Sequence, residues 1–384
     1  METLFWTLLG LIIYCYFGYP LLLTIWAAIF PKPVKKGNAW PLVSVVVAVW
    51  NEADVIEDKI KNFLALDYPR AKLEILIGSD GSSDSTNSIV QNFTDSRVRF
   101  FEYGTRRGKM AVLNDLAVQA HGEIILFTDA RQNLAEDALH QLVGNFNDAA
   151  VGCVSGELVL SQKSEGTAQG INMYWTYEKF LRKHESRLHS MLGATGAIYA
   201  IRKNLYEKIP SHFVLDDMYV PFKIIEKGYR AIFDETAQAF DQVANSPKEE
   251  YRRKVRTLYG NFQIFAAFGN LFNPLSSPMA IQLFSHKFLR VMVPLLMIAL
   301  FVINFALMNE RLYFNLFILQ IIFYAMAMMG SLARNQKHGI LKTISRVCYV
   351  PYVFCLLNFS ALMGLVKFLL AKQDVTWKKA RDKK

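Results

Sequence analysis

The long apolar segments near both ends of the chain most constrain what it can fold into. The first of them, residues 4–30, contains no charged side chain, and about 20 apolar residues suffice to cross a bilayer. A cleaved signal peptide would begin with basic residues, whereas here Lys32, Lys35 and Lys36 follow the segment. Because positive charge remains on the cytosolic side, we predict a transmembrane helix over residues 1–31, with the N-terminus outside and the next domain in the cytosol.

The C-terminal third contains the other apolar segments. Residues 248–287 begin with a basic run and continue as an aromatic-rich stretch broken by glycine, asparagine and proline, which predicts interfacial helices. Residues 288–332 predict a transmembrane hairpin with a short polar turn. Residues 333–371 predict a basic loop and then an interfacial, re-entrant or transmembrane segment, and residues 372–384 form a charged tail. We therefore expect an integral membrane protein.

Composition narrows the classes of partner. Hydrophobic residues make up 52% of the 384 residues, and the net charge is +10. This excess of basic residues is typical of the cytosolic side of membrane proteins, where it also attracts anionic lipid headgroups. No nucleic-acid-reading motif accompanies the charge, so we expect membrane lipids and no nucleic acid among the partners. The cysteines show no metal-ligand spacing and are predicted to be reduced thiols: Cys15, Cys153, Cys348 and Cys355.

Between the apolar ends, residues 42–241 alternate between strand and helix patterns. The expected strands are residues 42–49, 73–78, 98–103 and 123–128. Helical patterns separate these runs, an order that predicts an α/β domain with a mainly parallel, Rossmann-like sheet. Ligands of such sheets bind beyond the carboxyl ends of the strands, where Asp80 and Asp129 fall.

Carboxylates at these positions suit metal binding and proton transfer, although each also has a structural interpretation. Taken singly, Asp80 is equally well a helix N-cap and Asp129 an ordinary strand-to-loop residue. The pair Asp216 and Asp217 would cap a helix N-terminus. The basic residues 252–256 would, alone, form a membrane-surface patch. Only their order along the chain distinguishes a functional set from four separate structural features.

Taken in order, these elements resemble family 2 glycosyltransferases of the GT-A fold, in the branch that includes bacterial cellulose and hyaluronan synthases. The matching stretches are Val45–Glu52, Leu66–Pro69, Asp80, Gly108–Asn114, Asp129, Thr195–Ala197, Asp216–Asp217 and Arg253–Thr257. The resemblance covers about residues 40–270. It implies a cytosolic GT-A catalytic domain over residues 32–247, with transmembrane and interfacial helices on either side, in a bacterial inner membrane.

The resemblance also implies roles for individual residues. Asp217 matches the general base, and Asp129 matches the first aspartate of the metal site, for Mg²⁺ or Mn²⁺. The nucleotide-sugar contacts that it implies are Asn51, Glu52, Asp80, Lys109, Asp129, Arg253 and Arg256. The acceptor contacts that it implies are Thr195, Gly196 and Asp216. The activity implied is inverting transfer from a UDP-hexose or UDP-N-acetylhexosamine to a growing polysaccharide, with β-linkages.

Four positions depart from the family pattern. Arg131 stands where the family has a second metal-binding aspartate, so diphosphate oxygens and water would complete the metal's shell. Asp216 replaces a glutamate, and Arg253 replaces a glutamine. Thr257 replaces a tryptophan that stacks on the acceptor sugar. These changes leave two alternatives open: transfer of one sugar to a lipid-linked acceptor, and a scaffold that has lost catalysis.

The tail contains one more match. Thr376, Trp377 and Lys378 resemble the gating loop of cellulose synthases, and the alternative is an ordinary charged juxtamembrane tail. A gating tail must lie in the cytosol. We therefore favour an interfacial or re-entrant segment over residues 347–370, interrupted near Pro351 or Asn358. The apolar length of this segment would nevertheless suffice to span a membrane. With so few spans, a polymer channel would need a homo-oligomer or export partner subunits.

Overall fold

The computed structural model describes residues 1–161, 167–242, 247–333 and 340–371. The chain divides into two compact units. An α/β unit is built on Ala27–Ser161 and Arg182–Gln242, and a helical unit on Met1–Trp26, Gln162–Leu181 and Val243–Gln373. Each is described below by itself.

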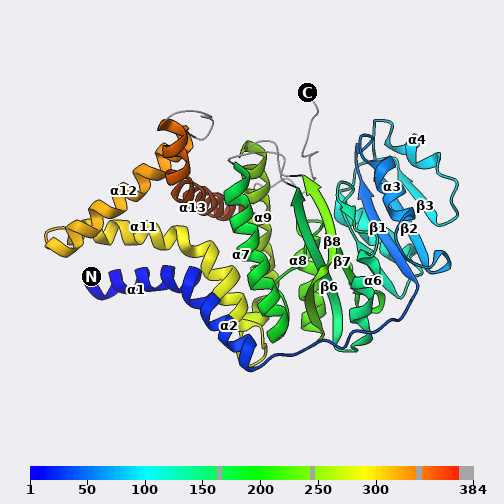
Figure 1. The fold of residues 1–384 in the computed structure, drawn as a ribbon, viewed down its shortest axis with the longest axis horizontal. Coiled ribbons are helices and arrows are strands. Elements are labelled where there is room, and N and C mark those ends of the chain that lie inside the picture. Colours follow the sequence, from blue (N-terminus) through cyan, green and yellow to red (C-terminus); the bar gives the residue numbers. More distant parts are fainter. Residues whose placement is uncertain (162–166, 243–246, 334–339, 372–384) are drawn as a thin grey trace. The chain divides into compact units, whose positions relative to one another are not determined.

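The α/β unit is organised around β1 (Val43–Val49), which is buried at every position. Its run of valines favours the pleated conformation and explains why both faces of the strand are covered. The sheet has eight strands in the order β3-β2-β1-β4-β7-β6-β8-β5 (Figure 1). The other strands are β2 (Leu73–Asp80), β3 (Val98–Tyr103), β4 (Ile124–Phe127), β5 (Asn133–Leu134), β6 (Val151–Ser161), β7 (Tyr199–Arg202) and β8 (Arg230–Gln242).

Parallel pairing dominates the half of the sheet that was predicted from the sequence. β1 pairs in parallel with β2 and β4, and β2 with β3. β6 and β8 are also parallel, whereas β7 runs antiparallel to β4 and β6, and β5 runs antiparallel to β8. The mainly parallel sheet and its first four strands are thus confirmed. The antiparallel β7 returns the chain beside β4, next to the predicted metal-binding aspartate.

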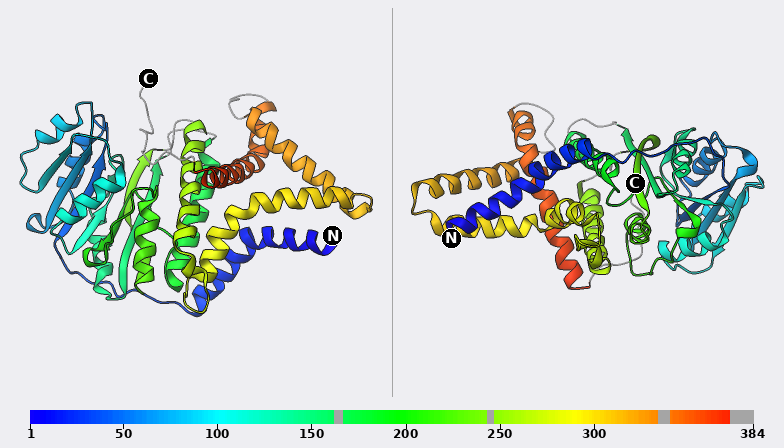
Figure 2. Two further views of the ribbon diagram at one scale, coloured as in Figure 1. Left: turned by 180° about the vertical axis from the view of Figure 1, so that it is seen from behind. Right: turned by 90° about the horizontal axis from the view of Figure 1, so that it is seen from below.

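Helices cover the two faces of this sheet (Figure 2). They are α3 (Ile56–Leu64), α4 (Thr86–Gln91), α5 (Lys109–Gln119), α6 (Ala138–Gly144) and α8 (Asp216–Glu226), with short 3₁₀ turns at Arg70–Lys72, Asn145–Asn147 and Lys203–Leu205. The apolar face of α3 packs into the main core through Ile56, Ile60 and Phe63. These elements position the loops at the carboxyl ends of β1, β2 and β4.

The helical unit consists of long apolar helices and two amphipathic ones. Its elements are α1 (Glu2–Ile13), a π-helical turn (Tyr14–Gly18), α2 (Tyr19–Ile29), α7 (Thr167–Leu188), α9 (Pro247–Ala267), a 3₁₀ turn (Gly269–Phe272), α10 (Ala280–Gln282), a second π-helical turn (Leu283–Phe288), α11 (Leu289–Leu307), α12 (Arg311–Ala333) and α13 (Ile340–Leu369). The last residues of α2 and α7 continue into the α/β unit. All four cysteines are free, as predicted.

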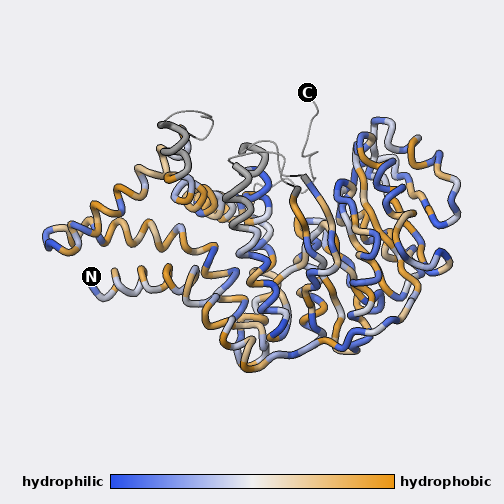
Figure 3. The backbone as a smooth tube through the Cα atoms, in the orientation of Figure 1, coloured by the Kyte–Doolittle hydropathy of each residue, from blue (hydrophilic) through white to orange (hydrophobic). Residues whose placement is uncertain are grey.

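Among the described residues, four helical segments are long and apolar enough to cross a membrane: Glu2–Ile29, Ala280–Leu307, Arg311–Leu332 and Val347–Leu369. Along most of their length the residues are hydrophobic (Figure 3). Phe5 of α1 packs with Leu300 of α11 and Tyr313 of α12, which joins the N-terminal helix to the hairpin. The expected helices over the first segment and the hairpin are therefore present.

The interruption that we predicted near Pro351 or Asn358 is wrong. α13 continues through both residues as one helix. A proline removes only one backbone hydrogen bond, and packing against neighbouring helices compensates for such a loss. α13 runs across the direction of α11 and α12 (Figure 2), so whether it spans the membrane or lies at its surface stays a prediction.

Candidate active site

The carboxylate of Asp80 organises the turn that precedes α5. Asp80 ends β2 and is fully buried. Its Oδ1 accepts a hydrogen bond from the Arg107 amide (2.6 Å), and Oδ2 accepts one from the Gly108 amide (2.9 Å). Gly81 and Gly108 have φ values of +67° and +92°, which glycine adopts without strain. Asp80 therefore fixes the start of α5, and its contact with a nucleotide stays a prediction.

Asn51 and Glu52 follow β1, and both bind neighbouring loops. Asn51 has a φ of +53°, and its Oδ1 accepts a hydrogen bond from the Ser83 amide (2.8 Å). Glu52 is buried, and its Oε1 accepts a hydrogen bond from Arg131 Nη2 (3.1 Å). The structure thus gives Glu52 a partner, Arg131, that the motif did not suggest. The contact of Glu52 with the donor stays a prediction.

Lys109 connects two of the predicted carboxylates. Its Nζ donates to Asp129 Oδ1 over 2.8 Å and to Asp216 Oδ1 over 2.9 Å. Burial alone would lower the pKa of Lys109, but attraction to Asp129 and Asp216 outweighs it and holds the pKa above its usual value. The ammonium group is therefore charged and offsets the repulsion between the two carboxylates.

Gly196 is the point on which Asp129 and Asp217 converge. A Cβ atom at this glycine would lie 3.3 Å from Asp129 Oδ2 and 3.5 Å from Asp217 Oδ2. The Gly196 amide donates to Asp217 Oδ2 (3.0 Å), and its carbonyl accepts from the Asp129 amide (3.1 Å). Neighbouring Thr195 is buried, and its amide donates to Ser155 Oγ (3.0 Å). The predicted acceptor loop therefore lies beside both carboxylates.

The surroundings of Asp217 alter its acidity. Burial raises the pKa of Asp217 to about 6, the negative charge of Asp216 acts in the same direction, and Lys109 opposes them. A carboxylate with a pKa just below neutrality suits a general base, because it is ionised and still accepts a proton readily. The chemistry expected of Asp217 is thus compatible with its environment.

Tyr199 on β7 supports Asp216, and sequence reasoning does not identify it. Its hydroxyl donates to Asp216 Oδ2 over 3.0 Å. The side chain is fully buried, and its ring stacks on Phe127 with centroids 4.9 Å apart. The tyrosine and the aspartate are 17 residues apart and share no local pattern. Only the pairing of β7 with β4 could have revealed this contact.

The remaining predicted residues belong to the helical unit or to the tail. Arg253 and Arg256 belong to α9 in the helical unit, and their roles on the diphosphate stay predictions. Thr376, Trp377 and Lys378 lie outside the described residues, so gating by the tail also stays a prediction.

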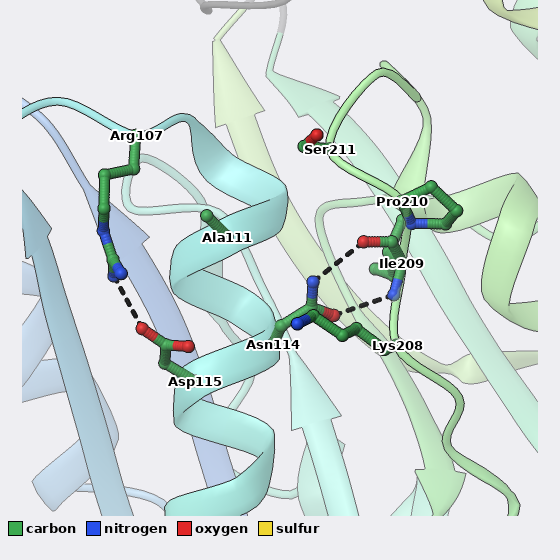
Figure 4. Close-up of a pocket in the computed structure, with 8 residues that line it drawn as sticks. All are labelled: Arg107, Ala111, Asn114, Asp115, Lys208, Ile209, Pro210 and Ser211. Atoms are coloured by element: carbon green, nitrogen blue, oxygen red, sulfur yellow. Dashed lines mark hydrogen bonds and ion pairs between the residues drawn. The ribbon is translucent and has the colours of Figure 1, made fainter.

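A cavity of about 400 Å³ adjoins the exposed face of α5 (Figure 4). Asn114 joins its two walls, because its amide side chain donates to the Ile209 carbonyl and accepts from the Ile209 amide, each over 2.8 Å. Its lining consists of Arg107, Ala111, Asn114, Asp115, Lys208, Ile209, Pro210 and Ser211. These are not the predicted site residues, so the cavity is distinct from the carboxylate cluster.

The residues around Asp129 fit a divalent cation that receives few ligands from the protein. Among the described residues, no group of three or more histidine, cysteine, aspartate or glutamate side chains could hold a metal ion. Asp129 is 45% exposed, and its Oδ2 faces the space beside Gly196. Mg²⁺ commonly takes one or two carboxylates and completes its shell with phosphates and water. Asp129 can thus be its one carboxylate ligand.

Comparison with known proteins gives a consistent result. Residues 44–210 match the model of the family described as Glycosyl transferase family 2. The chain is 26% identical over 229 residues to a poly-β-1,6-N-acetyl-D-glucosamine synthase of Staphylococcus aureus, covering 58% of this chain and 55% of that protein. It is also 26% identical over 250 residues to "Probable glycosyltransferase YdaM" of Bacillus subtilis, covering 62% of this chain and 59% of the relative. The chain thus spans little more than half the length of these relatives.

A solved structure shares the fold over nearly the whole chain. It is the mannosyltransferase PcManGT from Pyrobaculum calidifontis, in complex with GDP-Man and Mn²⁺. The TM-score is 0.72 at 24% sequence identity, covering 96% of this chain and 100% of that one. The fold and the family model agree with the motifs along the sequence. Residues 44–210 therefore match the Glycosyl transferase family 2 domain, and the chain has the predicted GT-A fold.

Proposed function

We propose that this protein is an inverting glycosyltransferase that moves a sugar from a nucleotide-sugar to a growing polysaccharide at a membrane, forming β-linkages. The observation that carries the proposal is the convergence of Asp129 and Asp217 on Gly196, just beyond the carboxyl end of β4. Ligands of α/β sheets bind at this edge. The family 2 domain and the similarity to a polysaccharide synthase support the same activity.

Asp217 is the proposed general base. It removes the proton of the acceptor hydroxyl while that oxygen attacks the anomeric carbon, and the bond to the diphosphate breaks on the opposite side. A single displacement inverts the anomeric configuration, so an α-linked donor gives a β-linked product. The Gly196 amide, which donates to Asp217 Oδ2 over 3.0 Å, orients the carboxylate for this step. Thr195 and Asp216 are proposed to contact the acceptor.

Positive charge is proposed to stabilise the departing nucleoside diphosphate. Asp129 would hold Mg²⁺ or Mn²⁺, which supplies a Lewis acid to the phosphate oxygens. Lys109 binds the same carboxylate in this structure. A metal at Asp129 would free the Lys109 ammonium group for the donor. Arg253 and Arg256 are proposed to contact the diphosphate. The Mn²⁺ in the mannosyltransferase structure is consistent with this cofactor.

The donor is proposed to be a UDP-hexose or UDP-N-acetylhexosamine. Asn51, Glu52 and Asp80 lie in the loops after β1 and β2, where a nucleotide would bind. The product named for the Staphylococcus aureus relative, poly-β-1,6-N-acetyl-D-glucosamine, favours the N-acetylated sugar. The mannosyltransferase shares only the fold and was solved with GDP-Man, so GDP-mannose is the appropriate competing donor.

Release of nucleoside diphosphate tests the activity. The purified full chain in detergent is incubated with UDP-N-acetylglucosamine, UDP-glucose or GDP-mannose, in Mg²⁺, Mn²⁺ or EDTA. We expect release from a UDP-sugar that needs the metal and is lost in the Asp217→Asn variant, while binding of UDP is retained. Full activity of that variant would contradict the assigned base. Binding without turnover by the wild type would instead support a scaffold.

A second function, transfer of one sugar to a lipid-linked acceptor, is favoured by one observation. Thr257 on α9 is exposed, and its hydroxyl donates to the Arg253 carbonyl (3.0 Å), so no aromatic platform for a sugar chain exists at this position. Product length distinguishes the two functions: a ladder of radiolabelled products indicates polymerisation, and one added sugar indicates the alternative.

The protein is proposed to lie in a bacterial inner membrane with its catalytic domain in the cytosol, where nucleotide-sugars are made. The basic residues after the first apolar segment support this orientation. Protease accessibility of the α/β unit in inverted vesicles, compared with intact cells, tests it. Homo-oligomers or export partner subunits would be needed for a continuous polymer channel, because four candidate spans are described.

A further inference from the structure

Lys59 is a charged residue in the middle of the apolar face of α3. Ile56, Ile60 and Phe63 occupy the same face at helical spacing and are fully buried. Lys59 is equally inaccessible, with 1% of its surface exposed. A hydrophobic residue would satisfy the amphipathic pattern here, and natural proteins break such local rules mainly at functional sites. A role for the buried ammonium group is therefore expected.

The ammonium group of Lys59 is costly to bury. Desolvation lowers the pKa of Lys59 to about 7, against the attraction of Asp129 and Asp241, which raises it. The Nζ atom also lies 4.6 Å from the centre of the Phe63 ring, a contact that favours a cation. Replacing a buried charged group together with its partners by apolar groups of similar volume is often neutral or stabilising. Stability of the fold alone thus gives little reason to place a lysine here.

The hydrogen bonds of Lys59 point to one loop. Its Nζ donates to Thr128 Oγ1 over 3.1 Å and to the Gln132 carbonyl over a short distance. These acceptors lie at the two ends of the segment 128–132, which carries Asp129 and Arg131. One ammonium group therefore closes this loop from the core side and fixes the distance between its ends.

The loop 128–132 is also hydrogen-bonded to the predicted acceptor loop, residues 195–197. Thr128 Oγ1 donates to the Ala197 carbonyl over 2.7 Å, and the Asp129 amide donates to the Gly196 carbonyl over 3.1 Å. Gly196 in turn donates to Asp217 (3.0 Å). A displacement of Thr128 would thus change the position of Asp129 relative to the proposed base.

We propose that Lys59 is a positioning residue for sugar transfer: its buried Nζ holds both ends of the loop 128–132 so that Asp129 faces the donor diphosphate. The inference rests on the proposed function. Lys59 does not touch the donor in this mechanism, and it acts through Thr128 and Gln132. Misplacement of catalytic groups by about 1 Å can reduce a rate by about 100-fold, so loss of this lysine should lower kcat.

The decisive comparison is between Lys59→Met and Ile60→Ala, measured beside the wild type as full chains. Methionine has a similar length and lacks the charge and donors, so we expect a kcat reduced about tenfold or more. Because the buried Gln132 carbonyl loses its donor, we also expect a lower melting temperature. The KM for the acceptor should change little. Ile60→Ala opens a cavity on the same helix, so we expect a lower melting temperature and an unchanged kcat.

A kcat of Lys59→Met equal to that of the wild type would overturn the inference. If this variant fails to fold, Thr128→Val decides, because it removes the hydroxyl at one end of the loop and leaves the lysine in place. A reduced kcat in folded Thr128→Val supports the positioning role, and an unchanged kcat refutes it. A wild type that transfers no sugar would refute the proposed function itself, together with the inference that rests on it.

Discussion

Arg131 donates a hydrogen bond from Nη2 to Glu52 Oε1 over 3.1 Å. The arginine stands two residues after Asp129, where family 2 glycosyltransferases carry a second metal-binding aspartate, and the glutamate stands at a predicted donor contact. Glu52 is 7% and Arg131 22% exposed, so the pair is largely shielded from water. The positive charge at position 131 thus has a fixed partner.

A double-mutant cycle tests this pairing. Arg131→Met should destabilise the protein by about 1–3 kcal/mol, because it leaves the buried Glu52 carboxylate without its partner. Glu52→Gln should restore part of that loss in the double variant, with a coupling energy of about 0.5–3 kcal/mol. The exposed pair Lys61 and Glu57 on α3 (60% and 57% exposed) is the control, and the same cycle should give almost no coupling. Equal coupling in both pairs would contradict the interpretation.

Gly196 provides a second prediction. A methyl group in Gly196→Ala would lie 3.3 Å from Asp129 Oδ2 and 3.5 Å from Asp217 Oδ2, in the space that the reaction requires. We expect kcat/KM to fall by about 100-fold, as for other small displacements of reacting groups, with little change in melting temperature. Gly104→Ala is the matched control, since a Cβ there meets nothing within 4 Å. Equal activity of the two variants would show that this space is not used.

The sequence predicts the parallel half of the sheet well, because its strands depend on local patterns. Val43–Val49 form a strand through their β-branched side chains, and Asp80 and Asp129 lie at the ends of β2 and β4, as expected. Tyr199 and Lys59 could not be found in this way. Each contacts a residue distant in sequence, Asp216 and Thr128 respectively, and only the folded sheet brings these pairs together.

The apolar segment over residues 347–370 shows a different limit of prediction from sequence. Proline and asparagine favour a break in a helix, yet α13 passes through Pro351 and Asn358 without one. The Asn358 side chain donates to the Phe354 carbonyl over 2.9 Å, and so its amide is satisfied within the helix. Local propensity was outweighed by bonds and packing that the helix makes once it has formed.

The pH dependence of transfer follows from Asp217. Its pKa is raised to about 6, first by burial and then by Asp216, and a general base must be ionised to accept a proton. We therefore expect kcat/KM to fall as the pH is lowered through about 6 and to level off above about 7. Initial rates at saturating Mn²⁺ measure this profile. A profile that stays flat from about pH 5 to pH 8 would exclude Asp217 as the base.

The same shift predicts that Asp217 opposes folding at neutral pH. A carboxyl whose pKa is higher in the folded chain than its ordinary value of 3.8 binds protons more tightly when folded. Its contribution to the free energy of unfolding is therefore greatest below about pH 4 and is lost as the pH rises through about 6.

Asp217→Asn should then lose transfer by about 100-fold or more and still melt at a higher temperature than the wild type at pH 8, with the difference vanishing near pH 4. Asp58→Asn, at an exposed position on α3, should show neither effect. A variant of Asp217 that is both inactive and less stable at pH 8 would mean that this carboxylate supports the fold, and that its loss of activity says nothing about proton transfer.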